Sequence, residues 1–273
     1  MLLSIITINR NNAEGLEKTL KSVASQTFRD FEYVVIDGAS TDNSVEVIKK
    51  YETQFEHFKW ISESDTGIYN AMNKGIRMAD GEYCQFLNSG DFLASSMVVE
   101  LMLNQLKAKE YPDIIYGNMK KQLSNSKSII DKGGATDDVT LKIFYKGCLN
   151  HGPSYIRRSL FNEYGLYDES LKICSDWKFF LRSIVLGSAK VNYVDILVTV
   201  FDMGGISETR KDILEEERAR LLDEMIPSGI LKDYKKYSEP MEQYDRLSRH
   251  HMWGAINFIE RVLFKFEKWR IIK

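Results

Sequence analysis

The chain has 273 residues, of which 44% are hydrophobic and 28% are charged, with only 4 Pro and 17 Gly. This makeup is typical of a packed globular protein, and it excludes a disordered or collagen-like chain. The 37 basic and 39 acidic residues give a formal net charge of −2, so no overall positive field would hold nucleic acid. We expect one α/β domain with a tail, and no nucleic-acid partner.

Cysteine usage and hydropathy indicate a cytoplasmic protein. No Cys-x-x-Cys pair of the kind found in zinc and redox sites occurs among Cys84, Cys148 and Cys174. The apolar run at residues 2–8 is too short for the core of a signal peptide. No stretch approaches the ~18 apolar residues that span a bilayer. We therefore expect neither an export signal nor a transmembrane helix.

Strands and helices are predicted to alternate over the first part of the chain. Short apolar runs rich in β-branched residues predict strands at 2–8, 31–36, 58–61 and 82–87. Helices are predicted from Asn12, from Asp42 and over 70–79. This alternation predicts a mostly parallel, doubly wound sheet of the nucleotide-binding α/β class.

The pattern becomes mixed after about residue 110. It predicts a strand at 114–116, a polar loop with Gly133 and Gly134, helices from Ser159 and over 175–186, and a strand at 191–201. From Thr209 the pattern is helical, with a break at 227–229. The chain is therefore divided into residues 1–208, with halves at 1–110 and 111–208, and a helical extension at 209–273.

Polar residues follow each predicted strand of the first half. Doubly wound sheets bind ligands beyond the carboxyl ends of their strands, so these residues are the first candidates for a site. They are Thr7, Asn9, Asp37, Glu63, Asp65 and Asp91. A carboxylate such as Asp37 can accept hydrogen bonds from a nucleobase N–H or from ribose hydroxyls. The alternative is that Asp37 shapes a turn and Asp42 caps the next helix.

Three motifs in this order and spacing resemble family 2 glycosyltransferases of the type A fold: DGASTD at 37–42, SDTGIYNAMNKG at 64–75 and FLNSGD at 86–91. The resemblance continues through NHG at 150–152, SDW at 175–177 and GGIS at 204–207. It implies transfer of a sugar from a nucleotide diphosphate donor to an acceptor hydroxyl, with inversion and a divalent metal. Residues 1–110 would then form the nucleotide-sugar-binding half and 111–208 the acceptor half.

The resemblance places the metal at Asp91, the last acid of the family's Asp-x-Asp type motif. A hard cation, Mn²⁺ or Mg²⁺, would bridge this carboxylate and the donor phosphates. The sequence departs from the fully acidic motif, because Asn88 and Gly90 stand where acids are often found. We therefore expect a weakly held metal, completed by the diphosphate and water. A turn Asp without a ligand is the alternative.

The resemblance also assigns donor and acceptor contacts. Asp176 occupies the place of the catalytic base, although an Asp at a helix start is also favoured by the helix dipole. The glycine-containing loop at 204–207 could fold over the diphosphate. Lys74 could be a solvated helix residue, Asp65 an N-cap and His151 a structural residue. The predicted donor-binding residues are Thr7, Asn9, Asp37, Asp65, Lys74, Asn88, Gly90 and His151.

Residues 252–269 form a strongly amphipathic helical pattern. Apolar and aromatic positions gather on one side, and basic residues lie opposite them. A helix of this kind can lie in an anionic membrane interface, which would dock the protein on the inner face of the membrane. The alternative is that the apolar face packs on the catalytic domain or on a second subunit in a homodimer.

The sequence is interpreted as a metal-dependent inverting glycosyltransferase that uses a nucleotide diphosphate sugar, with uridine as the expected nucleoside. Its acceptor would be a glycan or a lipid-linked acceptor in polysaccharide synthesis. One alternative is a sugar-nucleotide-binding protein without turnover, which is suggested by the small number of acids in the turn at 88–91. Another is a nucleotidyltransferase, which would normally show a glycine- and basic-rich loop after the first strand. Residues 7–12 contain one Arg and no Gly.

Overall fold

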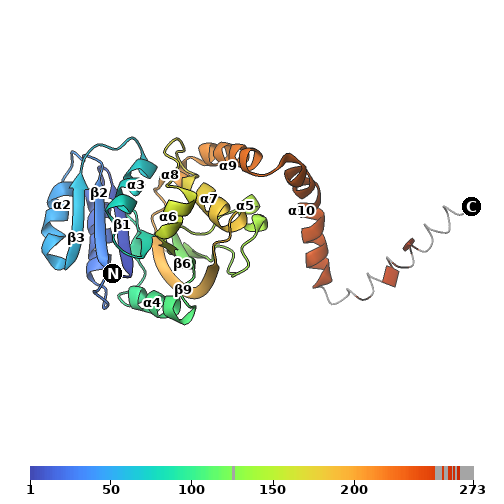
Figure 1. The fold of residues 1–273 in the computed structure, drawn as a ribbon, viewed down its shortest axis with the longest axis horizontal. Coiled ribbons are helices and arrows are strands. Elements are labelled where there is room, and N and C mark those ends of the chain that lie inside the picture. Colours follow the sequence, from blue (N-terminus) through green and yellow to red (C-terminus); the bar gives the residue numbers. More distant parts are fainter. Residues whose placement is uncertain (125–126, 250–253, 255–257, 260, 262, 265–273) are drawn as a thin grey trace, which may run out of the picture. The chain divides into compact units, whose positions relative to one another are not determined.

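The computed structural model describes residues 1–124, 127–249, 254, 258–259, 261 and 263–264. The chain forms two compact units, Met1–Glu217 and Arg218–Lys273 (Figure 1). The first unit contains the sheet and the cavity described below. Most of the segment 252–269, for which membrane contact was predicted, lies outside the described residues. Within the described part of the chain, no helix has the length and apolarity that crossing a bilayer requires.

Nine strands form one sheet in the described part of the chain, in the order β3-β2-β1-β4-β8-β6-β9-β5, with β7 paired to β6. Their bounds are β1 (Leu3–Asn9), β2 (Glu32–Asp37), β3 (His57–Ser62), β4 (Tyr83–Phe86), β5 (Phe92–Leu93), β6 (Ile114–Ser124), β7 (Lys127–Asp131), β8 (Ser154–Arg157) and β9 (Val191–Phe201). β1 pairs in parallel with β2 and β4, and β2 pairs in parallel with β3. The predicted parallel, doubly wound arrangement is thus confirmed for the first four strands.

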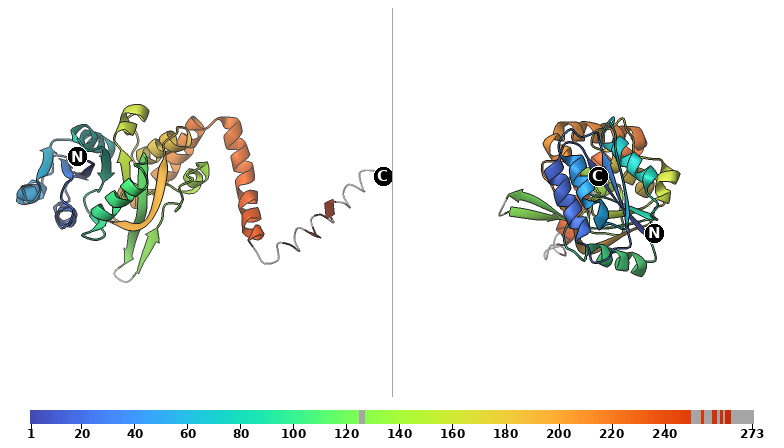
Figure 2. Two further views of the ribbon diagram at one scale, coloured as in Figure 1. Left: turned by 60° about the horizontal axis from the view of Figure 1, so that its bottom comes forward. Right: turned by 90° about the vertical axis from the view of Figure 1, so that its left-hand side faces the viewer.

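The second half of the sheet mixes strand directions. β8 runs antiparallel to both β4 and β6, while β6 and β9 are parallel. β6 continues well past the predicted strand at 114–116 and returns as β7, where a polar loop was predicted. This two-stranded ribbon extends away from the sheet (Figure 2). All residues of β7 except the last are exposed, Ile129 and Ile130 among them, and its five residues contain too short an apolar run to predict a buried strand.

The helices of the described residues begin and end as follows: α1 (Ala13–Ala24), α2 (Ser44–Tyr51), α3 (Ile68–Met78), α4 (Val98–Ala108), α5 (Leu141–Lys146), α6 (Ser159–Tyr164), α7 (Ser175–Phe180), α8 (Ile206–Thr209), α9 (Lys211–Met225) and α10 (Ser228–Ser248). Asn12 caps α1 as predicted, because its Oδ1 accepts the Gly15 N–H at 3.1 Å. A π-helical turn at Leu181–Val185 continues α7. The break predicted at 227–229 falls where α9 gives way to α10.

Alternate residues of β1 pack against helices on opposite faces of the sheet. Leu3 and Ile5 belong to the core formed with the apolar residues of α1, α2 and α4. Ile6 faces α3, where a Cβ on Gly75 would lie only 2.4 Å from Ile6 Cγ2. Helix α3 can therefore pack closely on the sheet only with a glycine at this position. This packing brings the start of α3 next to the carboxyl end of β1, where the candidate site lies.

Candidate active site

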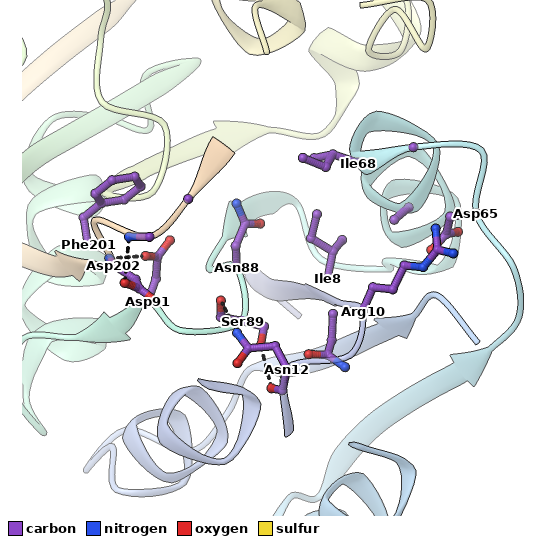
Figure 3. Close-up of a pocket in the computed structure, with 15 residues that line it drawn as sticks. Ile8, Arg10, Asn12, Asp65, Ile68, Asn88, Ser89, Asp91, Phe201 and Asp202 are labelled. Atoms are coloured by element: carbon purple, nitrogen blue, oxygen red, sulfur yellow. Dashed lines mark hydrogen bonds between the residues drawn. The ribbon is translucent and has the colours of Figure 1, made fainter. Parts of the chain in front are cut away.

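A cavity of about 480 Å³ lies at the carboxyl end of β1. The turn after β4, the start of α3 and the segment that follows β9 complete its wall. Four of the predicted site residues line it: Asn9, Asp65, Asn88 and Asp91. Figure 3 shows Asp91 and Asp202 together at one side, Arg10 and Asp65 at the other, and Asn88 between them. The cavity therefore lies where doubly wound sheets bind ligands.

Asp91 and Asp202 bring two carboxylates to the same side of the cavity. The side chain of Asp91 is 8% exposed, and its Oδ1 accepts the backbone N–H of Asp202 at 2.8 Å. Burial raises the pKa of Asp91 to about 7, and the negative charge of Asp202 adds to this effect. Asp202 itself is exposed, and its Oδ1 accepts the Gly204 N–H at 3.0 Å. Among the residues that the structure describes, no backbone N–H donates to Asp91 Oδ2 or to Asp202 Oδ2.

Gly90 allows the turn that carries Asp91 to lie close to Asp202, which follows β9. Its φ of +104° is a conformation that other residues rarely adopt, and a Cβ there would lie 2.7 Å from Asp202 Oδ2. Any side chain at this position would therefore push Asp202 away from the turn that carries Asp91. Gly90 was predicted to contact the donor. It does not line the cavity, and its geometry accounts for the glycine without such a contact.

Two buried amide oxygens in the cavity wall have no hydrogen-bond partner within the described residues. They are Asn88 Oδ1 and Asn9 Oδ1. A buried polar atom without a partner costs free energy, so a ligand atom or water that bonds to it would be stabilising. With the carboxylates of Asp91 and Asp202, Asn88 Oδ1 offers the oxygen ligands that Mg²⁺ and Mn²⁺ favour. The donor set therefore fits a divalent cation.

The number of carboxylates near this position is small. Across the described residues, no three His, Cys, Asp or Glu side chains gather closely enough to hold a metal ion. Asp91 and Asp202 alone would leave most coordination positions of the cation to other oxygens. A diphosphate can supply these oxygens together with water. This donor set matches the weakly held metal expected from the sequence, and metal binding itself stays a prediction.

Asp65 is held in the cavity wall by Lys74. The Lys74 ammonium donates to Asp65 Oδ1 at 2.7 Å and to the Ser64 carbonyl at 2.9 Å, and it pairs with Glu63 at 2.9 Å. Burial opposes the charge on Lys74, but the bonds to both carboxylates outweigh it and raise the pKa of the ammonium. Lys74 does not line the cavity. The contacts of Lys74 therefore favour a role in orienting Asp65 over a direct contact with the donor phosphates.

Asp37 and Thr7 are buried, and neither is among the residues that line the cavity. The buried carboxylate of Asp37 accepts hydrogen bonds from Asn9 Nδ2 at 2.8 Å, from the Ser40 N–H at 2.9 Å, and from the hydroxyls of Ser40 and Ser62. Burial alone would raise the pKa of Asp37, but these four bonds lower it. Thr7 donates to the Leu87 carbonyl at 2.7 Å. For Asp37, the geometry favours the alternative in which it shapes the turn after β2.

His151 packs among aromatic rings. Its imidazole stacks on Phe86 with ring centroids 4.8 Å apart, and its Nε2 hydrogen-bonds to the Tyr167 hydroxyl at 2.7 Å. Burial lowers the pKa of His151, and the negative charge of Asp176 opposes that shift. The neutral imidazole is therefore favoured. His151 does not line the cavity, so its contacts favour the structural alternative over a direct donor contact.

Asp176 is the second residue of α7, and it lies close to α3. The Tyr69 hydroxyl donates to Asp176 Oδ1 at 3.0 Å, and it shares its hydrogen with the carbonyl of Ile173. Burial, and then the charge of Asp176, raise the pKa of Tyr69 well above its usual value, so this hydroxyl stays a donor. Asp176 is not among the residues that line the cavity. Its carboxylate is nevertheless oriented by the hydrogen bond from Tyr69.

The structure adds residues that the sequence interpretation did not assign. Arg10, Phe201 and Asp202 line the cavity. Asp202 directly follows β9, so the strand-end rule that selected Asp91 would also have selected it if applied to the second half. Arg10 lies on the loop after β1, and Figure 3 shows its side chain directed toward Asp65. No sequence pattern singled out Phe201, which is part of a predicted strand.

The chain is similar in sequence to glycosyltransferases. The profile of glycosyl transferase family 2 matches residues 4–165. An uncharacterized glycosyltransferase of Mycobacterium tuberculosis is 31% identical over 259 residues, which cover 92% of this chain and 90% of the relative. A PGL/p-HBAD biosynthesis glycosyltransferase of the same species is 29% identical over 213 residues, which cover 77% of this chain and 81% of the relative.

Solved structures resemble the fold. S. aureus TarS in complex with UDP-GlcNAc superimposes with a TM-score of 0.62 at 22% identity. The match covers 74% of this chain and 58% of that chain, which is less than two thirds of its length. The mannosyltransferase PcManGT from Pyrobaculum calidifontis, in complex with GDP-Man and Mn²⁺, gives a TM-score of 0.57 at 18% identity. At these identities the similarity concerns the architecture of the sheet and its helices.

Proposed function

This chain belongs to glycosyl transferase family 2, and we propose that it transfers a sugar with inversion from a nucleotide diphosphate donor to an acceptor hydroxyl, using a divalent cation. One observation carries the proposal. Asp91 and Asp202, which are joined by the hydrogen bond from the Asp202 N–H to Asp91 Oδ1, line a cavity at the carboxyl end of β1 whose wall also contains the unpaired Asn88 Oδ1. A diphosphate with its cation needs such a site, because the cation requires oxygen ligands from the protein.

Asp91, Asp202 and Asn88 would hold the cation. When bound, Mn²⁺ or Mg²⁺ neutralises the charge that develops on the departing diphosphate. The Asp202 N–H donates to Asp91 Oδ1 at 2.8 Å, and this bond would hold these two proposed ligands next to each other. The loop at Gly204 and Gly205 forms another part of the wall, where its backbone can approach the donor.

We propose a uridine nucleotide as the donor, because TarS, which has the highest of the TM-scores given above, was solved with UDP-GlcNAc. Asp65 and Arg10 line the side of the cavity opposite Asp91, so they are placed to bind the ribose, base or phosphate. Asn9 Oδ1 offers a further acceptor for a donor N–H or hydroxyl. The other residues predicted to bind the donor do not line the cavity, and we propose that they support the residues that do: Thr7, Asp37, Lys74, Gly90 and His151.

Asp176 is the proposed general base. As the acceptor oxygen attacks the anomeric carbon, the bond between that carbon and the diphosphate oxygen breaks on the opposite face, and the hydroxyl proton passes to the Asp176 carboxylate. The Tyr69 hydroxyl hydrogen-bonds to Asp176 Oδ1 and would orient this carboxylate. The proposed acceptor is a glycan or a lipid-linked glycan of polysaccharide synthesis. Peripheral membrane contact through 252–269 would bring the enzyme to such an acceptor.

The products of turnover test the proposal. The purified protein is incubated with UDP- and GDP-sugars, Mn²⁺ or Mg²⁺, and a panel of glycan and lipid-linked acceptors. Release of nucleoside diphosphate that depends on acceptor supports transfer, and the anomeric configuration of the product tests inversion. Release of pyrophosphate would instead indicate a nucleotidyltransferase. Binding of a nucleotide sugar without release of either product would indicate a non-catalytic binding protein.

A further inference from the structure

The loop before Asp176 has no secondary structure of its own to hold it in place. Residues 165–174 connect α6 to α7. Helix α3 contacts this loop on one side, because Asn73 Nδ2 donates to the Tyr167 carbonyl at 2.9 Å and to Glu169 Oε1 at 2.8 Å. The position of Asp176 therefore depends on side chains that reach the loop from other elements.

Glu217 of α9 binds three consecutive amides of this loop. Its Oε1 accepts the Lys172 N–H at 2.7 Å, and its Oε2 accepts the N–H groups of Ile173 and Cys174 at 3.0 Å each. The Glu217 side chain is only 7% exposed. No cation of the described residues forms an ion pair with it, so backbone amides alone satisfy its charge there. A buried carboxylate requires such compensation.

The peptide group between Ile173 and Cys174 is held from both sides. Glu217 accepts its N–H, which belongs to Cys174, and Tyr69 donates to its carbonyl, which belongs to Ile173. The same Tyr69 hydroxyl lies 3.0 Å from Asp176 Oδ1. A shift of Ile173 would therefore move the carbonyl that shares the Tyr69 hydrogen, and with it the hydrogen bond that orients Asp176. Glu217 does not touch Asp176, and its influence must pass through this peptide.

We propose that Glu217 is a positioning residue for the general base. It holds the loop at 172–174 so that Tyr69 can hydrogen-bond to Asp176. This inference rests on the proposed function, because it takes Asp176 as the base. It also gives the start of the C-terminal helical part a role in catalysis, since Glu217 lies beyond the residues 4–165 that match the family profile.

The test compares Glu217→Gln with Glu216→Gln, a matched control. Glu216 is the exposed neighbour of Glu217 on the same helix. Glutamine keeps the shape of the side chain but turns an amide NH₂ toward one of the loop N–H groups. We expect kcat to fall by about 10- to 100-fold, because small misplacements of a catalytic group have effects of this size. The donor KM and the control should change by less than about threefold.

A double variant tests whether Glu217 acts through the hydrogen bond from Tyr69. In the double variant with Tyr69→Phe, the losses in kcat should not add, because both changes act through the same peptide.

The outcomes distinguish this inference from the proposed function. If Asp176→Asn keeps wild-type kcat, the assignment of the base is wrong and the role of Glu217 is lost with it. If Asp176→Asn is impaired but Glu217→Gln keeps wild-type kcat, or loses kcat and donor affinity equally, Glu217 is not a positioning residue. Should Glu217→Gln fail to fold, Glu217→Asp, which keeps the charge and shortens the reach, is measured in the same way with the same criteria.

Discussion

Replacing Asp91 with Asn should remove metal-dependent donor binding and leave the fold intact. Asn keeps an oxygen that can accept the Asp202 N–H, which lies 2.8 Å from Asp91 Oδ1. Asp91→Ala would leave that N–H without a partner and cost about 1–3 kcal/mol of stability. The Asn variant therefore separates the loss of a charged metal ligand from the loss of a structural hydrogen bond.

The expected size of the effect follows from ligand linkage. A donor and cation present at about 100 times their dissociation constant stabilise the wild type by about 2.7 kcal/mol. For a folded unit of 217 residues, Met1–Glu217, this corresponds to a rise in Tm of about 5–10 °C. Without a charged ligand at position 91 the cation loses one of two protein carboxylates, so the rise should nearly vanish in the variant.

The assay measures Tm with a UDP-sugar, with and without Mn²⁺, and then nucleoside diphosphate release under the same conditions. The exposed Asp30 supplies the control, because Asp30→Asn makes the same chemical change far from the cavity lining. Asp30→Asn should show the full Mn²⁺-dependent rise in Tm. A wild-type rise and wild-type turnover in Asp91→Asn would refute the assignment of Asp91 as a metal ligand.

The other predictions concern the base, the loop before it and the C-terminal segment. Asp176→Asn should lower kcat by roughly 10²–10⁴ at unchanged donor affinity, and an equal loss of both would place it in the donor site. Burial opposes the charge of Asp168, but bonds from Lys178 and Ser170 lower its pKa to about 2. The contribution of ionised Asp168 to the free energy of unfolding is fully present above the unfolded pKa of 3.8, and it is lost as pH falls through about 2. Asp168→Asn should therefore cost about 1 kcal/mol in urea unfolding at pH 7 and progressively less at lower pH, and a cost independent of pH would contradict the ion pair. Release from anionic liposomes, with unchanged transfer to a short soluble acceptor, is expected when Glu replaces Arg261, Lys265 and Lys268, and a wild type that does not bind such liposomes at low salt would refute the membrane role.

Local patterns were sufficient for the first half of the fold. The buried runs predicted β1, β2 and β4 within two residues of their observed ends, because a strand covered on both faces needs apolar residues throughout. The Asn12 cap was predictable for a related reason, since its side chain bonds an amide only three residues away. The motifs that resemble family 2 lie in this half and beyond it, and the family is confirmed.

Two strands in the second half of the sheet, β7 and β8, could not be predicted from local sequence, because they form by pairing with other strands. The sequence predicted a strand at 114–116, and the structure extends it into a ribbon with β7, in which all residues but the last are exposed. β8 spans only four residues and is a strand because it lies between β4 and β6, antiparallel to both. Neither β7 nor β8 shows the regular spacing of apolar residues that predicts a strand. Their pairing is therefore decided only when distant segments meet in the sheet.

The candidate site, like the fold, was predictable from the sequence only in part. The sequence by itself determined that Asn9, Asp65, Asn88 and Asp91 gather in one cavity, because the carboxyl ends of neighbouring parallel strands share an edge. Only the tertiary structure decided the partners of each group. It brings Asp202 to Asp91 across 111 residues and surrounds other polar side chains, Asp37 among them, with hydrogen-bond donors from the protein. The strand-end rule depends on topology, which local sequence encodes, whereas hydrogen-bond partners depend on the final packing of segments far apart in the chain.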